Sequence, residues 1–339
     1  MPTLLLLLAA VVACLAPDRA QADGPRIIVL AHTQVQDAAA DPAAAMASVF
    51  KRQVEQATGG AVRVDLFPEG MVGGNREMAR LVGANTIQSA LVTVGGVTPV
   101  YPPLAVVQMP FAFDSADAAY GVYDGPFGRR LAAEIEAHTG MAVLGFGDSG
   151  GFHVITNSRG PVHGAKDLAG LKLRTIPGAE VIDAMIRAFG ATPVRVGSRE
   201  ELTALASGIV DGQMNPPMVL LNRRYDQVQR YVTLTNHLYL PYVWLFNRQA
   251  LDELPSEHRQ AVRAAATAAI AAGRALSRQG TEGGLPALYR RMEVVTPTPA
   301  ERAAMKAAVQ PAVRAAIAKT LGDDGIRLLD DFLAAAKGR

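Results

Sequence analysis

Arg174 is a candidate for ligand chemistry. It stands near the C-terminal end of residues 171–175, a segment that is predicted to form a strand. Ligands of open α/β sheets bind beyond the carboxyl ends of the strands, and a guanidinium can hold a carboxylate through two parallel hydrogen bonds. Arginines are mostly exposed, so a plain surface residue at a strand end is the competing interpretation.

A second polar cluster follows the apolar pair Ile209 and Val210. It has the sequence DGQMNPP and occupies residues 211–217. Because Asn215 precedes Pro216, its backbone is biased toward an extended conformation, which could present its amide to a ligand. A simple turn would explain the same residues.

The string GDSGG at residues 147–151 is the strongest enzyme-like signal in the sequence. It looks like the serine motif of chymotrypsin-type proteases, and His32 precedes it as the catalytic histidine would. That fold is all-β and usually has disulfides, whereas this chain alternates strands and helices. We therefore favour a glycine-rich crossing between two lobes and keep a serine hydrolase using Ser149 as a remote alternative.

Other catalytic and metal signatures are missing from the sequence. It contains no Walker A string, no GxSxG, no HExxH and no Rossmann glycine fingerprint. The six histidines show no metal-ligand spacing, and most are expected on the surface or at caps. We expect no enzyme activity, no metal and no cofactor.

The elements that must position these residues alternate between strand and helix. Short apolar runs or alternations at residues 26–31, 62–67 and 90–94 predict strands, and residues 43–57 and 76–83 predict helices between them. This order favours βαβ units and a largely parallel sheet.

The same alternation returns after residue 150, with strands at 171–175 and 192–196 around a helix at 179–189. Ser198 and Glu201 have the spacing of a capping box that opens a further helix. The repeated pattern indicates a second lobe.

The last third of the chain is predicted to be helical. Residues 257–279 are alanine-rich and could extend about 35 Å, enough to bridge two lobes. Thr298, Pro299 and Glu301 form a second helix-start signal. We expect lobe 1 at residues 23–147 plus about 236–275, lobe 2 at 148–235 plus about 276–310, and a C-terminal helical segment at 311–339.

The first 22 residues are predicted to be a signal peptide. An apolar stretch at residues 4–13 is too short to span a bilayer, and Ala20, Gln21 and Ala22 form a cleavage site. The alternative is a lipid anchor on Cys14, which follows a lipobox-like Val-Val-Ala. Cys14 is the only cysteine, so a chain cleaved after Ala22 can form neither a disulfide nor a thiolate metal site.

The bulk composition excludes some partners. The 339 residues carry a formal net charge of +2 and no long run of like charge, which argues against a nucleic-acid partner. Hydrophobic residues make up 50%, which suits a well-buried soluble chain of about two domains.

Several segments, in order, resemble the substrate-binding subunits of tripartite ATP-independent periplasmic (TRAP) transporters. The resemblance covers about residues 26–320 and is carried by LFPEGMVGGNREM, QMPFAFDSADAAYGVYDGPFG, LAGLKLRT, AFGATPV, ELTALASGIVDGQMNPP and YDQVQRYVTLTNHLYLPYV. It implies a periplasmic, two-lobed α/β binding protein with hinge crossings and a long lobe-spanning helix. The implied partners are a small carboxylate and the TRAP integral membrane permease subunits, and we expect a monomer.

The resemblance also implies ligand-binding positions. The family's arginine and asparagine match Arg174 and Asn215, and further pocket positions fall on the following residues: Asn75, Thr93, His153, Thr33, Ser198 and Tyr239.

The sequence departs from the family at three positions. His153 stands where a second arginine is common, Met214 where a glutamate is usual and Ser198 where an aromatic is frequent. Compared with an arginine, a neutral His153 would bind a second negative charge of the ligand more weakly. A His153 that protonates would make ligand binding sensitive to pH near 6.5. We therefore expect a monocarboxylate or keto acid with an apolar body. A sensory module that presents its ligand to a receptor is the alternative function.

Overall fold

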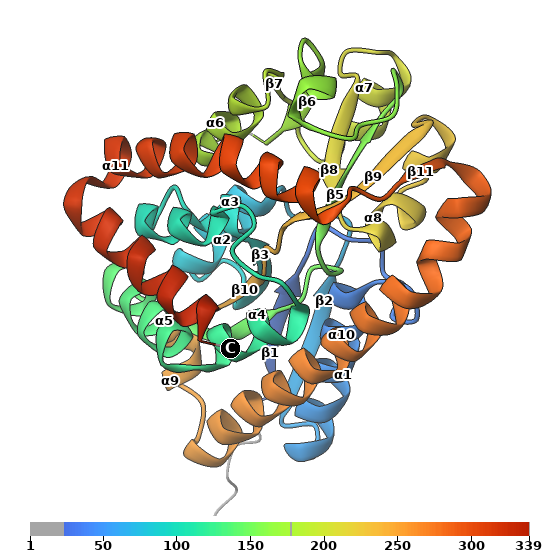
Figure 1. The fold of residues 1–339 in the computed structure, drawn as a ribbon. Helices are drawn as coiled ribbons and strands as arrows, with labels where there is room; N and C mark the ends of the chain where they lie inside the picture. The colour runs from blue at the N-terminus through green and yellow to red at the C-terminus, as the bar shows by residue number, and fades with distance from the viewer. Residues whose placement is uncertain (1–23, 177, 339) are drawn as a thin grey trace, which may run out of the picture.

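The computed structural model describes residues 24–338 apart from residue 177, and its strands form two sheets (Figure 1). The first sheet has the order β2-β1-β3-β10-β4, and its strands are β1 (Arg26–Ala31), β2 (Val62–Phe67), β3 (Ser89–Thr93), β4 (Met141–Gly147) and β10 (Tyr242–Asn247). The second has the order β11-β9-β5-β8-β6-β7, and its strands are β5 (His153–Asn157), β6 (Lys172–Thr175), β7 (Thr192–Arg195), β8 (Gly212–Asn215), β9 (Tyr231–Leu238) and β11 (Glu293–Val295). The predicted signal peptide and Cys14 lie outside the described residues.

Each sheet has its own set of helices, and we call the two assemblies the first and second lobes. The first lobe contains α1 (Pro42–Ala57), α2 (Asn75–Gly83), α3 (Val94–Val97), η1 (Pro102–Gln108), α4 (Ala116–Asp124), α5 (Pro126–Thr139) and α9 (Arg248–Asp252). The second lobe contains η2 (Ala165–Leu168), α6 (Glu180–Ala188), α7 (Glu201–Ala206), α8 (Pro217–Asn222) and η3 (Tyr225–Gln227). This mixed α/β, two-lobed arrangement confirms the predicted fold class.

Strand β10 ties the first sheet together. It is buried along its whole length and runs antiparallel between β3 and β4, whereas β1 pairs in parallel with both β2 and β3. A strand buried on both faces needs a continuous apolar sequence, which YVWLFN supplies. Trp244 at its centre packs on Phe50 of α1 and donates a hydrogen bond to Ser89 Oγ at 2.9 Å.

Two long helices join the lobes. The first, α10 (Ser256–Arg291), packs against α1 of the first lobe and α8 of the second, so the predicted lobe-spanning helix is confirmed. It extends beyond the predicted residue 279 and passes through Gly280. A Cβ atom at that glycine would lie 2.2 Å from Met218 Sδ, so the glycine permits close packing of α10 on α8.

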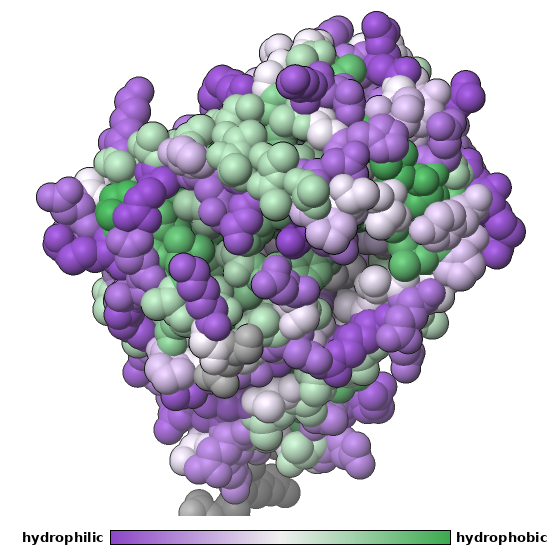
Figure 2. Space-filling model, viewed as in Figure 1, coloured by the Kyte–Doolittle hydropathy of each residue, from purple (hydrophilic) through white to green (hydrophobic). Residues whose placement is uncertain are grey.

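The second long helix, α11 (Pro299–Lys337), contacts α6 in the second lobe and η1, α4 and α5 in the first. Its start confirms the predicted capping box, since Thr298 Oγ1 accepts from Glu301 N and Glu301 Oε2 accepts from Thr298 N. The helix bends at Gly322, whose φ is 62°. In Figure 2 a pale green, hydrophobic band follows the alanine-rich part of α11. Hydrophilic side chains, in purple, cover much of the outline of the molecule in this view.

The chain passes between the sheets at residues 148–152 and again at residues 239–241. The lobe boundaries given above stay a prediction, although these two crossings lie near the predicted residues 147 and 236. Within the part of the chain that the structure describes, no helix combines the length and apolar character needed to cross a membrane.

Candidate functional site

A small cavity of about 120 Å³ lies between the two lobes. Seven of the eight predicted site residues line it, and they are Thr33, Asn75, Thr93, His153, Arg174, Ser198 and Asn215. Tyr239 does not line it. Its ring is buried at the crossing after β9, packed edge-on against Phe113, Tyr120 and Phe152, where it fills the core beside the hinge.

The guanidinium of Arg174 is held rigidly by protein groups. Its Nε donates to the carbonyl oxygen of Val196 at 3.0 Å, and its Nη2 donates to Ser198 Oγ at 3.4 Å. Its Nη1 lies 3.2 Å from Glu201 Oε2. The side chain is 8% exposed, so Arg174 is a buried cation at the cavity wall and not a plain surface residue.

Glu201 is a site residue that the sequence pattern did not reveal. Its predicted capping box with Ser198 is wrong, because α7 begins at Glu201 without a side-chain cap and the preceding residue is Glu200. The Glu201 carboxylate turns inward instead, to Arg174, and accepts a hydrogen bond from Asn215 Nδ2 at 3.1 Å. A buried guanidinium is a stronger partner for a carboxylate than a backbone N–H. Because Glu200 and Glu201 are neighbours of the same type, the sequence does not indicate which of the two carboxylates points toward the cavity.

Asn215 ends β8 immediately before Pro216, in the extended backbone that the Asn-Pro step predicted. Its Nδ2 donates to Glu201 Oε1 and, at 2.5 Å, to Gln213 Oε1. With both amide protons used within the protein, the Oδ1 atom is the part of Asn215 left to accept a hydrogen bond from a ligand.

His153 opens β5 and borders the cavity beside Met214. Burial, reinforced by the nearby positive charge of Arg174, lowers the pKa of His153 to about 4. Burial likewise lowers the pKa of His237 to about 3, and its Nε2 lies 3.3 Å from Met214 Sδ. Both imidazoles are therefore neutral at neutral pH. His237 and His32 are fully buried and His153 is half-buried, so these three do not follow the expectation that most histidines lie on the surface.

Both lobes offer hydroxyl groups to the cavity, from Thr93 at the end of β3 and from Thr175 at the end of β6. Asn75 Oδ1 accepts a hydrogen bond from the backbone N–H of Thr93 at 3.0 Å, which fixes α2 against the end of β3. The Oγ1 atoms of Thr93 and Thr175 are buried at the cavity, and neither has a hydrogen-bond partner among the residues that the structure describes. Buried hydroxyls normally find a partner, so both are available to a bound molecule.

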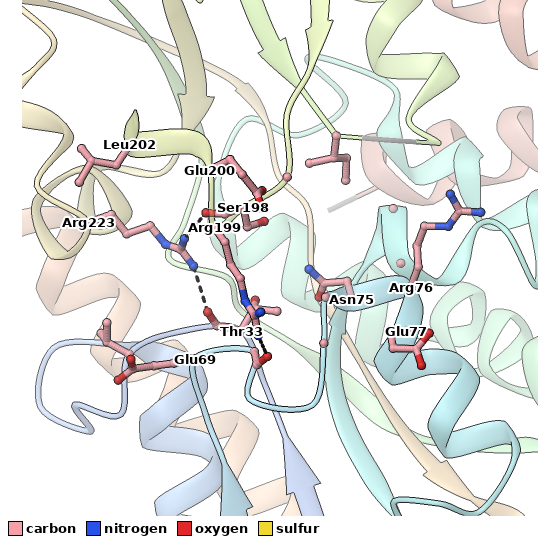
Figure 3. Close-up of a pocket in the computed structure, with 18 of the residues that line it drawn as sticks. Thr33, Glu69, Asn75, Arg76, Glu77, Ser198, Arg199, Glu200, Leu202 and Arg223 are labelled. Atoms are coloured by element: carbon pink, nitrogen blue, oxygen red, sulfur yellow. Dashed lines mark hydrogen bonds between the residues drawn. The ribbon is translucent and has the colours of Figure 1, made fainter. Parts of the chain in front are cut away.

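Arg223, also unrecognised in the sequence, closes the mouth of the cavity. From the end of α8 it donates to Ser198 O at 3.0 Å on its own lobe, and to Thr33 O and Gln34 Oε1, each at 3.0 Å, on the first lobe. Arg199 likewise donates to Gly70 O across the gap (Figure 3). Outside these contacts lies a wider cleft of about 920 Å³, into which Arg76 and Glu77 face.

The glycine-rich string forms the predicted crossing between the lobes, and Ser149 and His32 are each hydrogen-bonded to another group. Ser149 Oγ donates to Leu240 O at 2.6 Å, while Asp148 Oδ1 accepts from the N–H groups of Gly150 and Gly151. His32 Nε2 pairs with Gln36 Oε1 at 2.8 Å. Gly150 and Gly151 have φ values of 111° and 95°, which explains why glycines occupy this turn.

The sequence matches the DctP family, described as bacterial extracellular solute-binding protein, family 7, over residues 33–320. The chain belongs to this family. Among its relatives is a solute-binding protein of Verminephrobacter eiseniae, 34% identical over 212 residues. That match spans 62% of each of the two chains, which is less than two thirds of the relative.

Solved structures of periplasmic solute-binding proteins agree closely with the fold. The sugar acid binding protein of Advenella mimigardefordensis in complex with galactonate superposes with a TM-score of 0.85 at 28% identity, over 93% of this chain and 99% of that one. A TRAP periplasmic solute-binding protein of Polaromonas sp. JS666 bound to D-erythronate has a TM-score of 0.82 at 30% identity, over 91% and 98% of the two chains. The recognition of a TRAP solute-binding subunit is confirmed, and this family of transport proteins is periplasmic.

Proposed function

We propose that this family 7 protein captures a small organic acid by its carboxylate and delivers it to a TRAP integral membrane permease. The observation that carries this proposal is the position of Arg174. Its guanidinium is buried at the wall of an enclosed cavity between two lobes and held in place by Val196 and Ser198. A fixed, desolvated guanidinium is suited to recognising a planar carboxylate.

We further propose that the ligand has one carboxylate and a compact, partly apolar body, such as a monocarboxylate or a keto acid. Apolar side chains line much of the cavity, and they are Val94, Ile176, Ile182, Met214, Val219, Leu238 and Leu240. The neutral His153 adds no positive charge to that of Arg174 and Arg223 in the cavity wall. Galactonate and D-erythronate, held by the two solved relatives, are also acids with a single carboxylate.

The remaining predicted residues would orient the body of the acid. Asn215 Oδ1 would accept from a ligand hydroxyl, and the unpartnered hydroxyls of Thr93 and Thr175 would bond a keto or hydroxyl oxygen. Thr33, Asn75, His153 and Ser198 complete the proposed lining. Tyr239 would support the hinge and not touch the ligand.

The protein is proposed to act as a monomer in the periplasm and to bind its ligand without converting it. The signal peptide would be cleaved after Ala22, which mass spectrometry of the exported chain can check against lipidation of Cys14. Lobe opening would release the acid to the permease. An acid recovered chemically unchanged after incubation with the protein is the expected result.

A thermal-shift screen of residues 23–339 against mono- and dicarboxylates tests the ligand class. A ligand at about 100 times its dissociation constant adds about 2.7 kcal/mol to the free energy of unfolding, and a domain somewhat smaller than this chain gains roughly 2–4 °C per kcal/mol. The proposal predicts hits among single-carboxylate acids. A screen in which only neutral or cationic solutes raise the melting temperature would reject it.

A further inference from the structure

Glu201 places a negative charge inside a cavity assigned to an acid. Its side chain is 3% exposed and contacts Arg174 and Asn215, the two residues that the sequence most clearly predicts to bind the ligand. A buried carboxylate repels an incoming carboxylate, and it halves the positive charge that the two arginines bring. A site built only to maximise attraction for acids would not include it.

The charges that line the cavity can be counted. The charged side chains in its wall are Arg174, Arg223 and Glu201. His153 borders the same space, and burial keeps it neutral at neutral pH. The formal charge of the wall is therefore +1, which one carboxylate neutralises.

A second ligand carboxylate would leave an uncompensated negative charge in a small cavity whose lining is more apolar than polar. Unpaired buried charges are costly because they lose hydration without gaining a partner. The apolar side chains that border the same cavity, Ile176 and Leu238 among them, offer nothing to a second carboxylate.

We propose that Glu201 is a specificity-determining residue that restricts the cavity to ligands carrying a single negative charge. The inference rests on the proposed function of the same site and names its charge preference. It also gives a physical role to Glu201, the one acidic side chain among the described residues of the cavity wall.

The test is a calorimetric comparison of the wild-type protein with Glu201→Gln. Two matched pairs serve as probes: D-erythronate with meso-tartrate, and D-galactonate with galactarate. The members of each pair have the same carbon skeleton and configuration and differ in the number of carboxylates. The amide keeps the size of the side chain and an oxygen for Arg174 and Asn215, but it raises the wall charge from +1 to +2. The ratio of dicarboxylate to monocarboxylate affinity should rise at least tenfold.

Glu200→Gln is the matched control, because the same charge is removed from an exposed neighbour that does not line the inner cavity. Its affinity ratio should stay at the wild-type value. Should Glu201→Gln fail to fold, Glu201→Met removes the same charge with an apolar side chain of similar length, and the affinity ratio should again rise at least tenfold.

The outcomes separate this inference from the proposed function. If acids bind and the affinity ratio is unchanged in Glu201→Gln, or if the wild-type protein prefers the dicarboxylates, the charge restriction is wrong while acid binding stands. If none of the four probes binds either protein, the inference and the proposed function fail together for these acids. A shift in the ratio that Glu200→Gln reproduces would also overturn the role of Glu201.

Discussion

The Nη1 atom of Arg174 lies 3.2 Å from Oε2 of Glu201, and both side chains are almost completely buried. The carboxylate also contacts Asn215, so the three residues form one connected polar group at the end of the second sheet. Ion pairs of this kind contribute little net stability when intact, but removing one partner strands a buried charge. The pair therefore links the stability of the lobe to the chemistry of the site.

Arg174→Ala should lower the free energy of unfolding by roughly 3–5 kcal/mol, because Glu201 is left buried without its cation. The double variant Arg174→Ala with Glu201→Gln should recover much of this loss, since no charge remains unpaired. Urea unfolding of the wild type, both single variants and the double variant gives the coupling energy. Strictly additive effects would show that the two charges do not depend on each other.

Arg223→Ala should weaken acid binding at least tenfold while leaving the folded state intact. The variant loses hydrogen bonds from a charged donor to Thr33 and Gln34, each of about 1.5–3 kcal/mol, that hold the lobes together around the cavity. Titration calorimetry measures the effect. The exposed Arg230, whose nearest carboxylate is 3.9 Å away, provides the control variant Arg230→Ala, and an equal loss there would contradict the closing role.

His153 should make the protein less stable in mild acid. Its pKa is about 4 in the folded chain, against an ordinary value near 6.5. Between these values the unfolded chain binds a proton that the folded chain does not, so the free energy of unfolding falls as the pH drops from 6.5 to 4. The contribution approaches about 1.4 kcal/mol per pH unit near pH 5.

His153→Gln isolates this effect, because it removes one titrating group and leaves the others unchanged. Asp41, whose pKa burial raises to about 6, has the opposite sign but is present in both proteins. Urea unfolding at pH 5 and 6 should show a shallower pH dependence in the variant. Identical slopes would mean that His153 titrates normally in the folded state.

Gly95 of the first lobe allows Ile176 of the second lobe to approach closely. A Cβ atom at residue 95 would lie 2.4 Å from Ile176 Cδ1. The branched side chain of Gly95→Val should keep the lobes apart and reduce acid affinity about tenfold or more, with thermal stability nearly unchanged. Adding Ile176→Ala should restore part of the affinity. If Ile176→Ala does not restore acid affinity, the loss in Gly95→Val arises within the first lobe and not from contact with Ile176.

Much of the fold follows from local patterns in the sequence. Strands such as β1 and β3 are short apolar runs, and the start of α11 carries a capping box with both hydrogen bonds in place. These signals are local, because periodicity and caps involve residues close together in the chain. The α/β class and the lobe-spanning α10 could be predicted for this reason.

Site residues could be predicted only where the residue type and its neighbours in sequence already indicated ligand binding. Arg174 stood out at a strand end, and Asn215 stood before a proline. Glu201 was assigned to a cap because its alternative partner, Arg174, is 27 residues away in sequence. Arg223 was missed because its partners lie on the other lobe, 189 and 190 residues away. Tyr239 packs among aromatic residues that no local pattern connects to it.

The central claim is that Arg174 holds the carboxylate of an acid in the cavity. It is tested most directly by calorimetry of the strongest acid from the screen, with its carboxamide analogue, against the wild type and the folded double variant Arg174→Ala with Glu201→Gln. We predict binding of the acid to the wild type, and affinity at least a hundredfold lower for both the carboxamide and the double variant. Acid binding by the double variant within threefold of wild type would contradict the claim.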